Sequence, residues 1–231
     1  MRKLSRWLWT SVVLAMGCIG SAHSAEMGMG IRAGTLGGGL DFDISLLEKW
    51  NLRLGYNYLS YDQTVDDTDL RYDGTIKISS FSALLDWQIA GPFRLTFGAV
   101  GSGPKIEVVG TPTAGGTYEI GNTTYTAAQI GRVNGEIKIG NSVAPYVGIG
   151  FGNVVGKRGR VSFLFDLGAI YGGTPDVSLT ATCNPSLPPA TCTALQTQLN
   201  NDVAVEIADL EQDVQAIKWY PIISLGVGIR F

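Results

Sequence analysis

The residues PIISLGVGIRF, at positions 221–231, alternate with the two-residue period of a β-strand. The odd positions are all apolar, whereas the even positions are small or polar apart from Ile222. A strand that packs on a water-soluble core would hide its large side chains. A strand with lipid outside and a crowded polar interior shows the pattern seen here. The stretch therefore predicts a membrane-spanning β-strand at the end of the chain.

The other end of the chain has the features of an export signal. Basic residues at positions 2–6 precede an apolar stretch at 7–19 that is too short to span a bilayer. Small residues follow, so we expect a signal peptide over residues 1–25, cleaved between positions 22 and 25. Cys18 leaves lipidation open as an alternative, although the preceding residues match a lipobox poorly.

Removal of the signal would leave 14 basic and 20 acidic residues, a net charge of −6, because the leader holds three of the 17 lysines and arginines. This balance excludes a basic nucleic-acid-binding protein. No segment of the mature chain reaches the ~18 apolar residues of a membrane helix, yet 45% of the whole chain is hydrophobic. A β-barrel needs only about ten alternating residues per crossing. Residues 26–231 are thus expected to form one barrel domain.

Alternating segments predict an all-β fold, an eight-stranded antiparallel transmembrane β-barrel. The expected strands cover 27–35, 40–46, 52–58, 81–89, 93–99, 133–153, 161–171 and 221–231. Residues 27–47 could also form one glycine-kinked strand, but single-chain bacterial barrels have even strand numbers. Ile76 and Ile78 are out of phase with the expected outward positions of 81–89, which predicts a β-bulge near Ser79 and Ser80.

The connections between these strands differ in length. Short turns at 48–51, 91–92 and 156–159 are expected to be periplasmic. Long extracellular loops are expected at about 62–73, 110–132 and 180–216. The last loop holds an amphipathic helix, since apolar residues recur every three or four positions from Leu195 to Ile217.

Charged side chains are expected on the inner face of the barrel. These are Arg32, Asp41, Asp43, Arg53, Asp86, Arg94, Asp166 and Arg230. We expect Arg230 and Asp166 to share a buried ion-pair network. Opposed charges could guide a zwitterionic solute through a pore. They could equally neutralise one another, because an eight-stranded barrel is just wide enough for side chains to fill its interior.

A second set of charges is acidic and falls in the expected extracellular loops. It comprises Asp66, Asp67, Asp69, Asp202, Glu206, Asp209 and Asp213. These carboxylates could form a rim that attracts small cations to the barrel mouth. The alternative is that the four on the helix are simply a solvated face, as most charge runs are.

Cysteine and histidine usage limits the chemistry of the chain. Cys183 and Cys192 are the two mature cysteines, and they flank a proline-rich tract, so we expect a disulfide in an oxidising compartment. The single histidine, His23, lies within the expected signal. Without a histidine as acid, base or ligand, we expect no enzyme activity, no metal and no cofactor.

Several segments resemble the carbapenem-associated outer-membrane protein (CarO-like) family. They are GRVNGEIKIGNSVAPYVGIGFGN (131–153), DLGAIYGGTPDVSLT (166–180), TYEIGNTTYT (117–126) and the acidic helix leading into YPIISLGVGIRF (220–231). The resemblance covers most of the mature chain. It implies an eight-stranded barrel with an elaborated extracellular part. It also implies passage of small basic amino acids such as ornithine, and of carbapenems.

Two functions remain open at this point. The first is a narrow or gated outer-membrane channel for small solutes, including basic or zwitterionic amino acids. The second is a non-conducting structural or display barrel whose loops bind an unknown partner. Expected partners are outer-membrane lipid and lipopolysaccharide, the barrel-assembly machinery through the C-terminal strand, and small polar solutes. We expect a monomer in the cell outer membrane that binds no nucleic acid.

Overall fold

The computed structural model describes residues 26–66, 70–101, 103–113, 115–138, 140–155, 159–216 and 218–231. The expected signal peptide, residues 1–25, lies outside these ranges and stays a prediction. Within them the chain is all-β apart from one helix, and its paired strands are antiparallel, which confirms the predicted class. The described residues form thirteen strands, however, rather than the eight expected.

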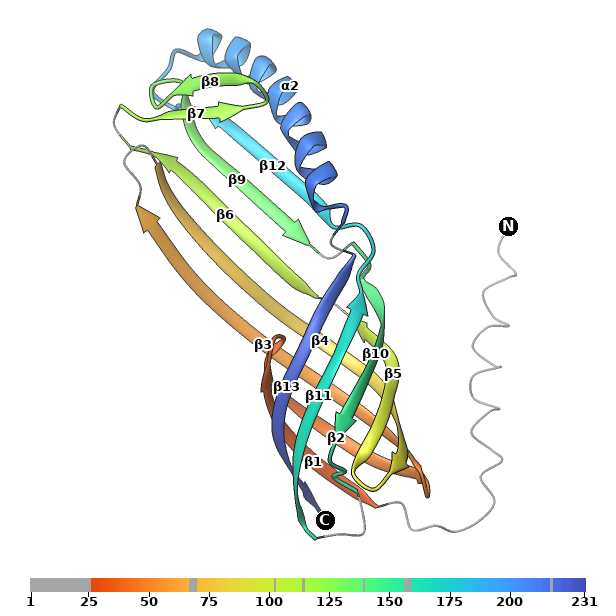
Figure 1. The fold of residues 1–231 in the computed structure, drawn as a ribbon. Coiled ribbons are helices and arrows are strands. Elements are labelled where there is room, and N and C mark those ends of the chain that lie inside the picture. The colour runs from red at the N-terminus through yellow and green to blue at the C-terminus, as the bar shows by residue number, and fades with distance from the viewer. Residues whose placement is uncertain are drawn as a thin grey trace, which may run out of the picture.

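The elements follow one another along the chain as shown in Figure 1. Their bounds are β1 Met27–Gly34, β2 Gly37–Leu47, β3 Trp50–Asp66, β4 Leu70–Ala90, β5 Phe93–Gly101, β6 Pro104–Pro112, β7 Thr117–Ile120, β8 Thr123–Thr126, β9 Ile130–Lys138, β10 Val143–Phe151, β11 Val161–Tyr171, β12 Asp176–Cys183, α2 Pro189–Val214 and β13 Trp219–Arg230.

Eight antiparallel pairings join end to end and close on themselves. Their order is β1–β2, β2–β3, β3–β4, β4–β5, β5–β10, β10–β11, β11–β13 and β13–β1. We call this closed ring the barrel. Residues 27–47 form two of its strands, separated by a turn at Thr35 and Leu36. Gly37 follows the turn with a φ of 91°, a value that favours glycine.

The outer face of the barrel is apolar. In β13, Ile223, Leu225, Val227 and Ile229 are exposed, while the intervening positions are buried or half-buried. The same alternation places Phe81 of β4 outward with 65% of its surface exposed. An apolar surface of this extent exceeds what monomeric soluble proteins leave uncovered, and it indicates contact with lipid.

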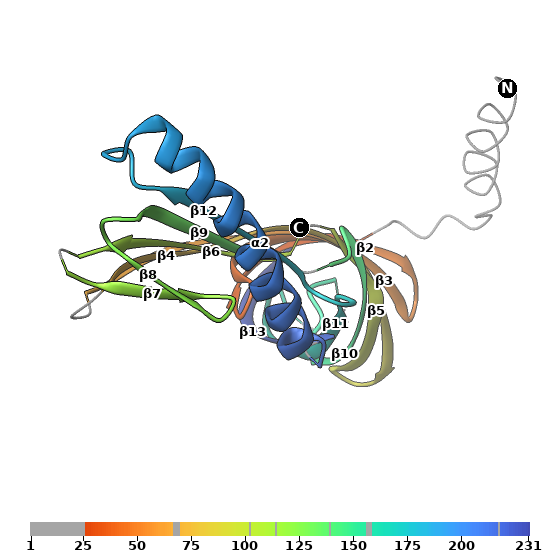
Figure 2. The same ribbon diagram turned by 90° about the horizontal axis from the view of Figure 1, so that it is seen from above.

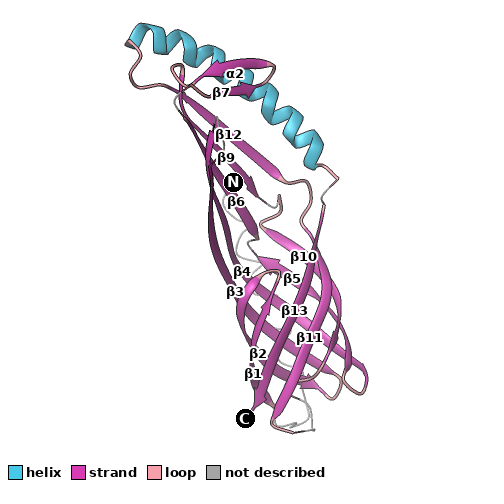
Figure 3. Ribbon diagram, turned by 60° about the vertical axis from the view of Figure 1, so that its left-hand side comes forward, coloured by secondary structure: helices cyan, strands magenta, loops and turns pink. Residues whose placement is uncertain are grey.

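β3 and β4 continue well beyond the barrel. Their register is unbroken from Trp50 opposite Trp87 to Asp66 opposite Arg71, so the bulge expected near Ser79 and Ser80 is absent. The reason is that Ile78 faces the barrel interior, in phase with Ser80. The end of β4 outside the barrel pairs with β6, which pairs with β9 and then β12. We call the sheet β3-β4-β6-β9-β12 beyond the barrel the blade (Figure 3).

The blade replaces segments that were expected to be loops. Residues 62–66 are the end of β3 and 70–73 the start of β4, and 110–132 include β7, β8 and the start of β9. Most of 180–216 is the end of β12 followed by α2. The single strand expected over 133–153 is divided into β9 in the blade and β10 in the barrel. Backbone pairing explains this difference for the strands of the blade and for the β7–β8 hairpin, whereas α2 satisfies its backbone hydrogen bonds within the helix.

The β7–β8 hairpin and α2 pack together against the blade. Leu199 and Val203, on the apolar stripe of the helix, are buried against Tyr118, Tyr125 and Ile130. The helix descends from the outer tip of the blade towards the start of β13 (Figures 1 and 2). No helix within the described ranges is long and apolar enough to cross a membrane.

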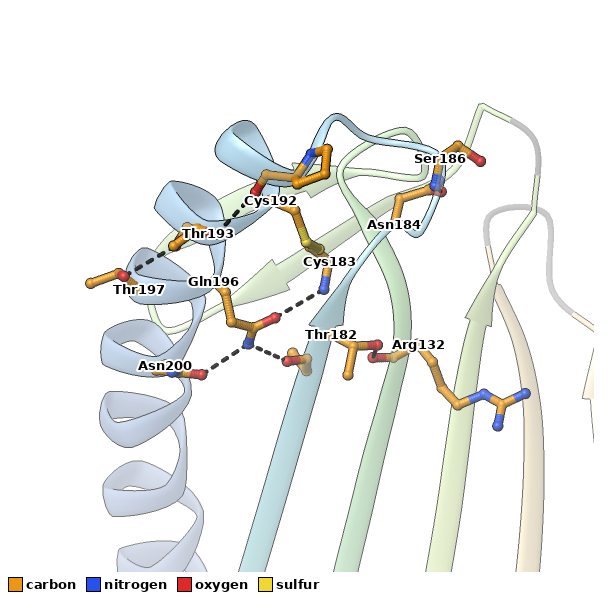
Figure 4. The surroundings of a disulfide bond; sticks show 12 residues. Arg132, Thr182, Cys183, Asn184, Ser186, Cys192, Thr193, Gln196, Thr197 and Asn200 are labelled. Carbon is orange, nitrogen blue, oxygen red and sulfur yellow. Dashed lines mark hydrogen bonds between the residues drawn. A yellow bond between two sulfur atoms is a disulfide. The ribbon is translucent and has the colours of Figure 1, made fainter.

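A disulfide links the end of β12 to the first turn of α2. Cys183 and Cys192 are bonded as expected, with their Cα atoms 5.8 Å apart. Gln196 reinforces the junction, since its Oε1 accepts from the Cys183 backbone N–H at 3.1 Å and its Nε2 donates to the Ala181 carbonyl at 2.8 Å (Figure 4). The bond therefore ties the helix to the edge of the blade.

Candidate functional site: the barrel interior

Six strands place charged side chains inside the barrel that meet in one network. They are Arg32 on β1, Asp41 on β2, Arg53 on β3, Asp86 on β4, Arg94 on β5 and Asp166 on β11. Each is at most 9% exposed. Successive side chains of a strand point to opposite faces. Strands that turn their apolar residues towards lipid therefore turn these charged residues towards the barrel interior.

Asp166 is the centre of this ion-pair network. Its Oδ2 accepts from Arg32 Nη1 and, at 3.2 Å, from Arg53 Nη1. Its Oδ1 accepts from Arg53 Nη2 at 3.2 Å and from Arg94 Nη2 at 2.6 Å. One carboxylate thus binds three guanidinium groups through charge-assisted hydrogen bonds, which are the strong class of such bonds.

The remaining acids complete the network. Asp41 accepts from Arg32 Nε, and Asp86 accepts from Arg53 Nη2 at 3.0 Å and from Thr96 Oγ1 at 2.5 Å. Asp43 is also buried, but its Oδ2 has no hydrogen-bond partner. Within the described residues no group of three histidine, cysteine, aspartate or glutamate side chains is arranged to hold a metal ion.

Glycines on the two other barrel strands make room for the arginines. A Cβ added at Gly150 of β10 would lie 2.7 Å from Arg94 Cζ. At Gly226 of β13, an added Cβ would lie 2.8 Å from Arg32 Cγ and 2.4 Å from the Ile31 carbonyl oxygen. The two strands that contribute no charge therefore contribute the space that the guanidinium groups occupy.

An apolar layer fills the interior between this network and the blade. Its buried members are Leu36, Ile78, Leu84, Val100, Ala144, Tyr146, Ile170 and Ile222. A cavity of about 50 Å³ remains between the layers, lined by Arg32, Arg53, Asp166, Leu84 and Tyr146 among others. Sequence reasoning missed this layer, although the even positions of β4 and β13 carried the signal in Ile78, Leu84 and Ile222.

Arg230 lies apart from the network. It pairs with Glu26 at 3.3 Å, and a quarter of its side chain is exposed. Asp166 is opposite Ser224 in the β11–β13 register, six residues from Arg230. At ~3.4 Å per residue the two positions are about 20 Å apart along the strand. The expectation that Arg230 shares a buried network with Asp166 is therefore wrong.

The acidic residues outside the barrel do not surround a single opening. Asp66 is the last residue of β3. The pairing of β3 with β2 ends at Tyr58, so Asp66 lies eight residues, or about 27 Å, further along the strand. Asp67 and Asp69 lie outside the described residues. The four acids on α2 are at the other side of the blade, so the rim expected from sequence is divided between two places.

The four acids on α2 form two pairs with different surroundings. Asp202 accepts a hydrogen bond from the Tyr125 hydroxyl, and Glu206 accepts from the Gly121 backbone N–H at 3.0 Å. These two acids anchor the β7–β8 hairpin. Burial and the bond to Asp202 raise the pKa of Tyr125 to about 12. Asp209 and Asp213 are exposed, so the solvated-face interpretation describes that half of the stripe.

A closed ring of antiparallel strands with a charged interior and an apolar outer belt has the fold of a bacterial outer-membrane protein. The crystal structure of Acinetobacter baumannii CarO2 aligns with a TM-score of 0.53 and 20% identity, over 90% of this chain and 100% of that one. Acinetobacter baumannii CarO aligns with a TM-score of 0.52 and 21% identity, over 88% and 97% of the two chains. The CarO-like resemblance is thereby confirmed at the level of the fold.

One more solved structure is similar in outline. A major outer membrane protein from Thermus thermophilus aligns with a TM-score of 0.42 and 14% identity, over 90% of this chain and 100% of that chain. No protein-family model matches the sequence, and no curated protein matches it either.

Proposed function

We propose that the eight barrel strands span the outer membrane and that the barrel is a non-conducting support for the blade, the β7–β8 hairpin and α2 outside the cell. The apolar belt of the barrel supports membrane insertion. Outer-membrane lipid and lipopolysaccharide would contact that belt. β13, with its apolar outer face, would be the strand that the barrel-assembly machinery receives.

The observation that carries this proposal is the contact between Arg53 and Asp166. Their strands, β3 and β11, are on opposite sides of the ring, and their side chains meet through two hydrogen bonds of 3.2 Å. The apolar layer, which includes Leu84 and Tyr146, covers this bridge on the blade side. A solute would have to displace both layers to pass.

A narrow or gated channel for small solutes, including basic or zwitterionic amino acids, is the second candidate. The cavity of about 50 Å³ favours it, because the cavity is lined by both Arg32 and Asp41 and so offers partners to both ends of a zwitterion. It has room for a few water molecules at most. Conduction would therefore require the apolar layer to move.

Reconstitution of the purified full chain tests the two candidates. We expect single-channel conductance and liposome swelling with ornithine or a neutral sugar to equal those of empty membranes. Ornithine flux above this background would favour the channel. The double variant Arg53→Ser with Asp166→Ser removes the bridge without changing the net charge. Combined with Leu84→Gly and Tyr146→Gly, which thin the apolar layer, it should admit small ions and so shows that the assay detects an opened barrel.

A further inference from the structure

A second cavity, of about 220 Å³, lies outside the barrel between the blade and its cover. Gly110 of β6 and Gly135 of β9 form part of its floor, each paired with a valine of the other strand, Val133 and Val108. Tyr118 of β7 with Glu206 and Leu210 of α2 form its roof. The volume is below the ~300–1,000 Å³ of drug-sized pockets, so the cavity suits a small molecule.

The hydroxyl group of Tyr118 has no hydrogen-bond partner in this cavity. The residue is 7% exposed, and its hydroxyl lies 3.5 Å from where a Cβ on Gly110 would be. A buried polar atom without a partner destabilises the fold, so such atoms are usually hydrogen-bonded. The neighbouring Tyr125 follows this rule, because its hydroxyl donates to Asp202. Tyr118 instead presents a donor and acceptor to whatever occupies the cavity.

The charge of the cavity is negative. Glu206 of α2 lines it, and no lysine or arginine is among its described lining residues. One oxygen of Glu206 accepts from the Gly121 backbone, which leaves the other lone pairs of the carboxylate available. The rings of Tyr72 and Tyr118 also line the cavity, and aromatic faces attract cations. These groups select a positive charge.

The other walls are apolar. Val108, Ile120 and Leu179 contribute hydrocarbon surface, so the ligand needs an apolar body. We propose that this cavity binds a small organic amine, with its ammonium group near Glu206, its body against the apolar wall, and a hydrogen bond to Tyr118. A zwitterionic amino acid would bring a carboxylate against the same glutamate. The site is thus distinct from the solute path considered for the barrel.

Isothermal titration of the full chain in detergent with three matched probes tests the proposal. Phenethylamine is the cationic probe, 2-phenylethanol is neutral and phenylacetate is anionic. We expect phenethylamine to bind about tenfold or more tightly than 2-phenylethanol, because a hydrogen bond between charged groups contributes more to binding than one made by a neutral group. Phenylacetate should not bind. Equal binding of amine and alcohol would overturn the proposal, since charge would then play no part.

Three variants locate the binding. Tyr118→Phe should lower the affinity for phenethylamine by about 2- to 10-fold, which corresponds to the loss of one hydrogen bond. Tyr61→Phe is the matched control, because its hydroxyl donates to Gln63 on the exposed part of β3 and does not line the cavity, and it should leave affinity unchanged. Gly135→Leu should abolish binding by filling the floor. Unchanged affinity in both Tyr118→Phe and Gly135→Leu would show that the probe partitions into the micelle, and would overturn the site. Hydrogen exchange in β7, β8 and α2 checks that each variant keeps the hairpin and helix folded on the blade.

Discussion

Arg53 and Asp166 bond to each other across the full width of the barrel interior, through two hydrogen bonds of 3.2 Å. Three strands separate β3 from β11 in either direction around the ring. Arg53 also holds Asp86, and Asp166 also holds Arg32 and Arg94. The bridge therefore links opposite walls, and it is the contact through which the interior is both closed and stabilised.

Replacing Arg53 with alanine tests how strongly the network stabilises the barrel. The change leaves Asp86 and Asp166 buried with fewer partners, which typically costs about 3–5 kcal/mol. Urea unfolding of the refolded protein in lipid vesicles measures this loss. Arg230→Ala is the matched control, and it should cost less than ~1 kcal/mol because its ion pair is partly exposed. Equal losses in the two variants would contradict the network described here.

Glycine replacements test how closely the strands approach the arginines. Gly226→Ala places a Cβ 2.4 Å from a backbone oxygen of β1, and we expect overpacking to cost about 1–3 kcal/mol. Gly38→Ala serves as the control, since a Cβ there meets no atom within 4 Å and should change stability by ~0.5 kcal/mol at most. The free energy of unfolding of both variants is measured by the same urea unfolding in lipid vesicles. An unchanged stability in Gly226→Ala would mean that β1 and β13 are not this close.

Alkaline titration tests the packing of the hairpin on α2. The pKa of Tyr125 is raised to about 12 by burial and by the bond to Asp202, and burial raises that of Tyr118 to about 12. Since an unfolded tyrosine titrates near 10, folding favours the protonated form. This stabilisation is complete below pH 10 and is lost as the pH rises through about 12. Tyrosinate absorbance should show one fewer late-titrating group in Tyr118→Phe and in Tyr125→Phe. Titration of both near 10 would contradict the burial.

Removing the disulfide should loosen the helix and spare the barrel. Cys183→Ser with Cys192→Ser releases a loop whose ends are nine residues apart, and loop closure predicts a local loss of about 2–3 kcal/mol. Hydrogen exchange should speed up in the first turns of α2 and at the end of β12. The heat-modified gel shift, which reports the barrel, should not change. Faster exchange throughout the barrel strands would show that the two regions unfold together.

The sequence by itself determined the outward and inward faces of the strands. The alternation in residues 221–231 predicts the exposure of Ile223 and Leu225 correctly, because side-chain direction in a strand has a period of two residues. The helix and the Cys183–Cys192 bond also followed from short-range patterns, namely apolar spacing and two cysteines in one exported segment. These features are local, and a few neighbouring residues suffice to specify them.

Only the tertiary structure decided which inward residues meet. The same alternation turned Arg53, Asp166 and Arg230 inward, but the stagger between strands brings the first two together and leaves Arg230 at the rim with Glu26. It also decided that β4 pairs with β5 inside the barrel and continues beyond it to pair with β6. Register and stagger depend on hydrogen bonds between segments far apart in the chain, and a period of two residues carries no information about them.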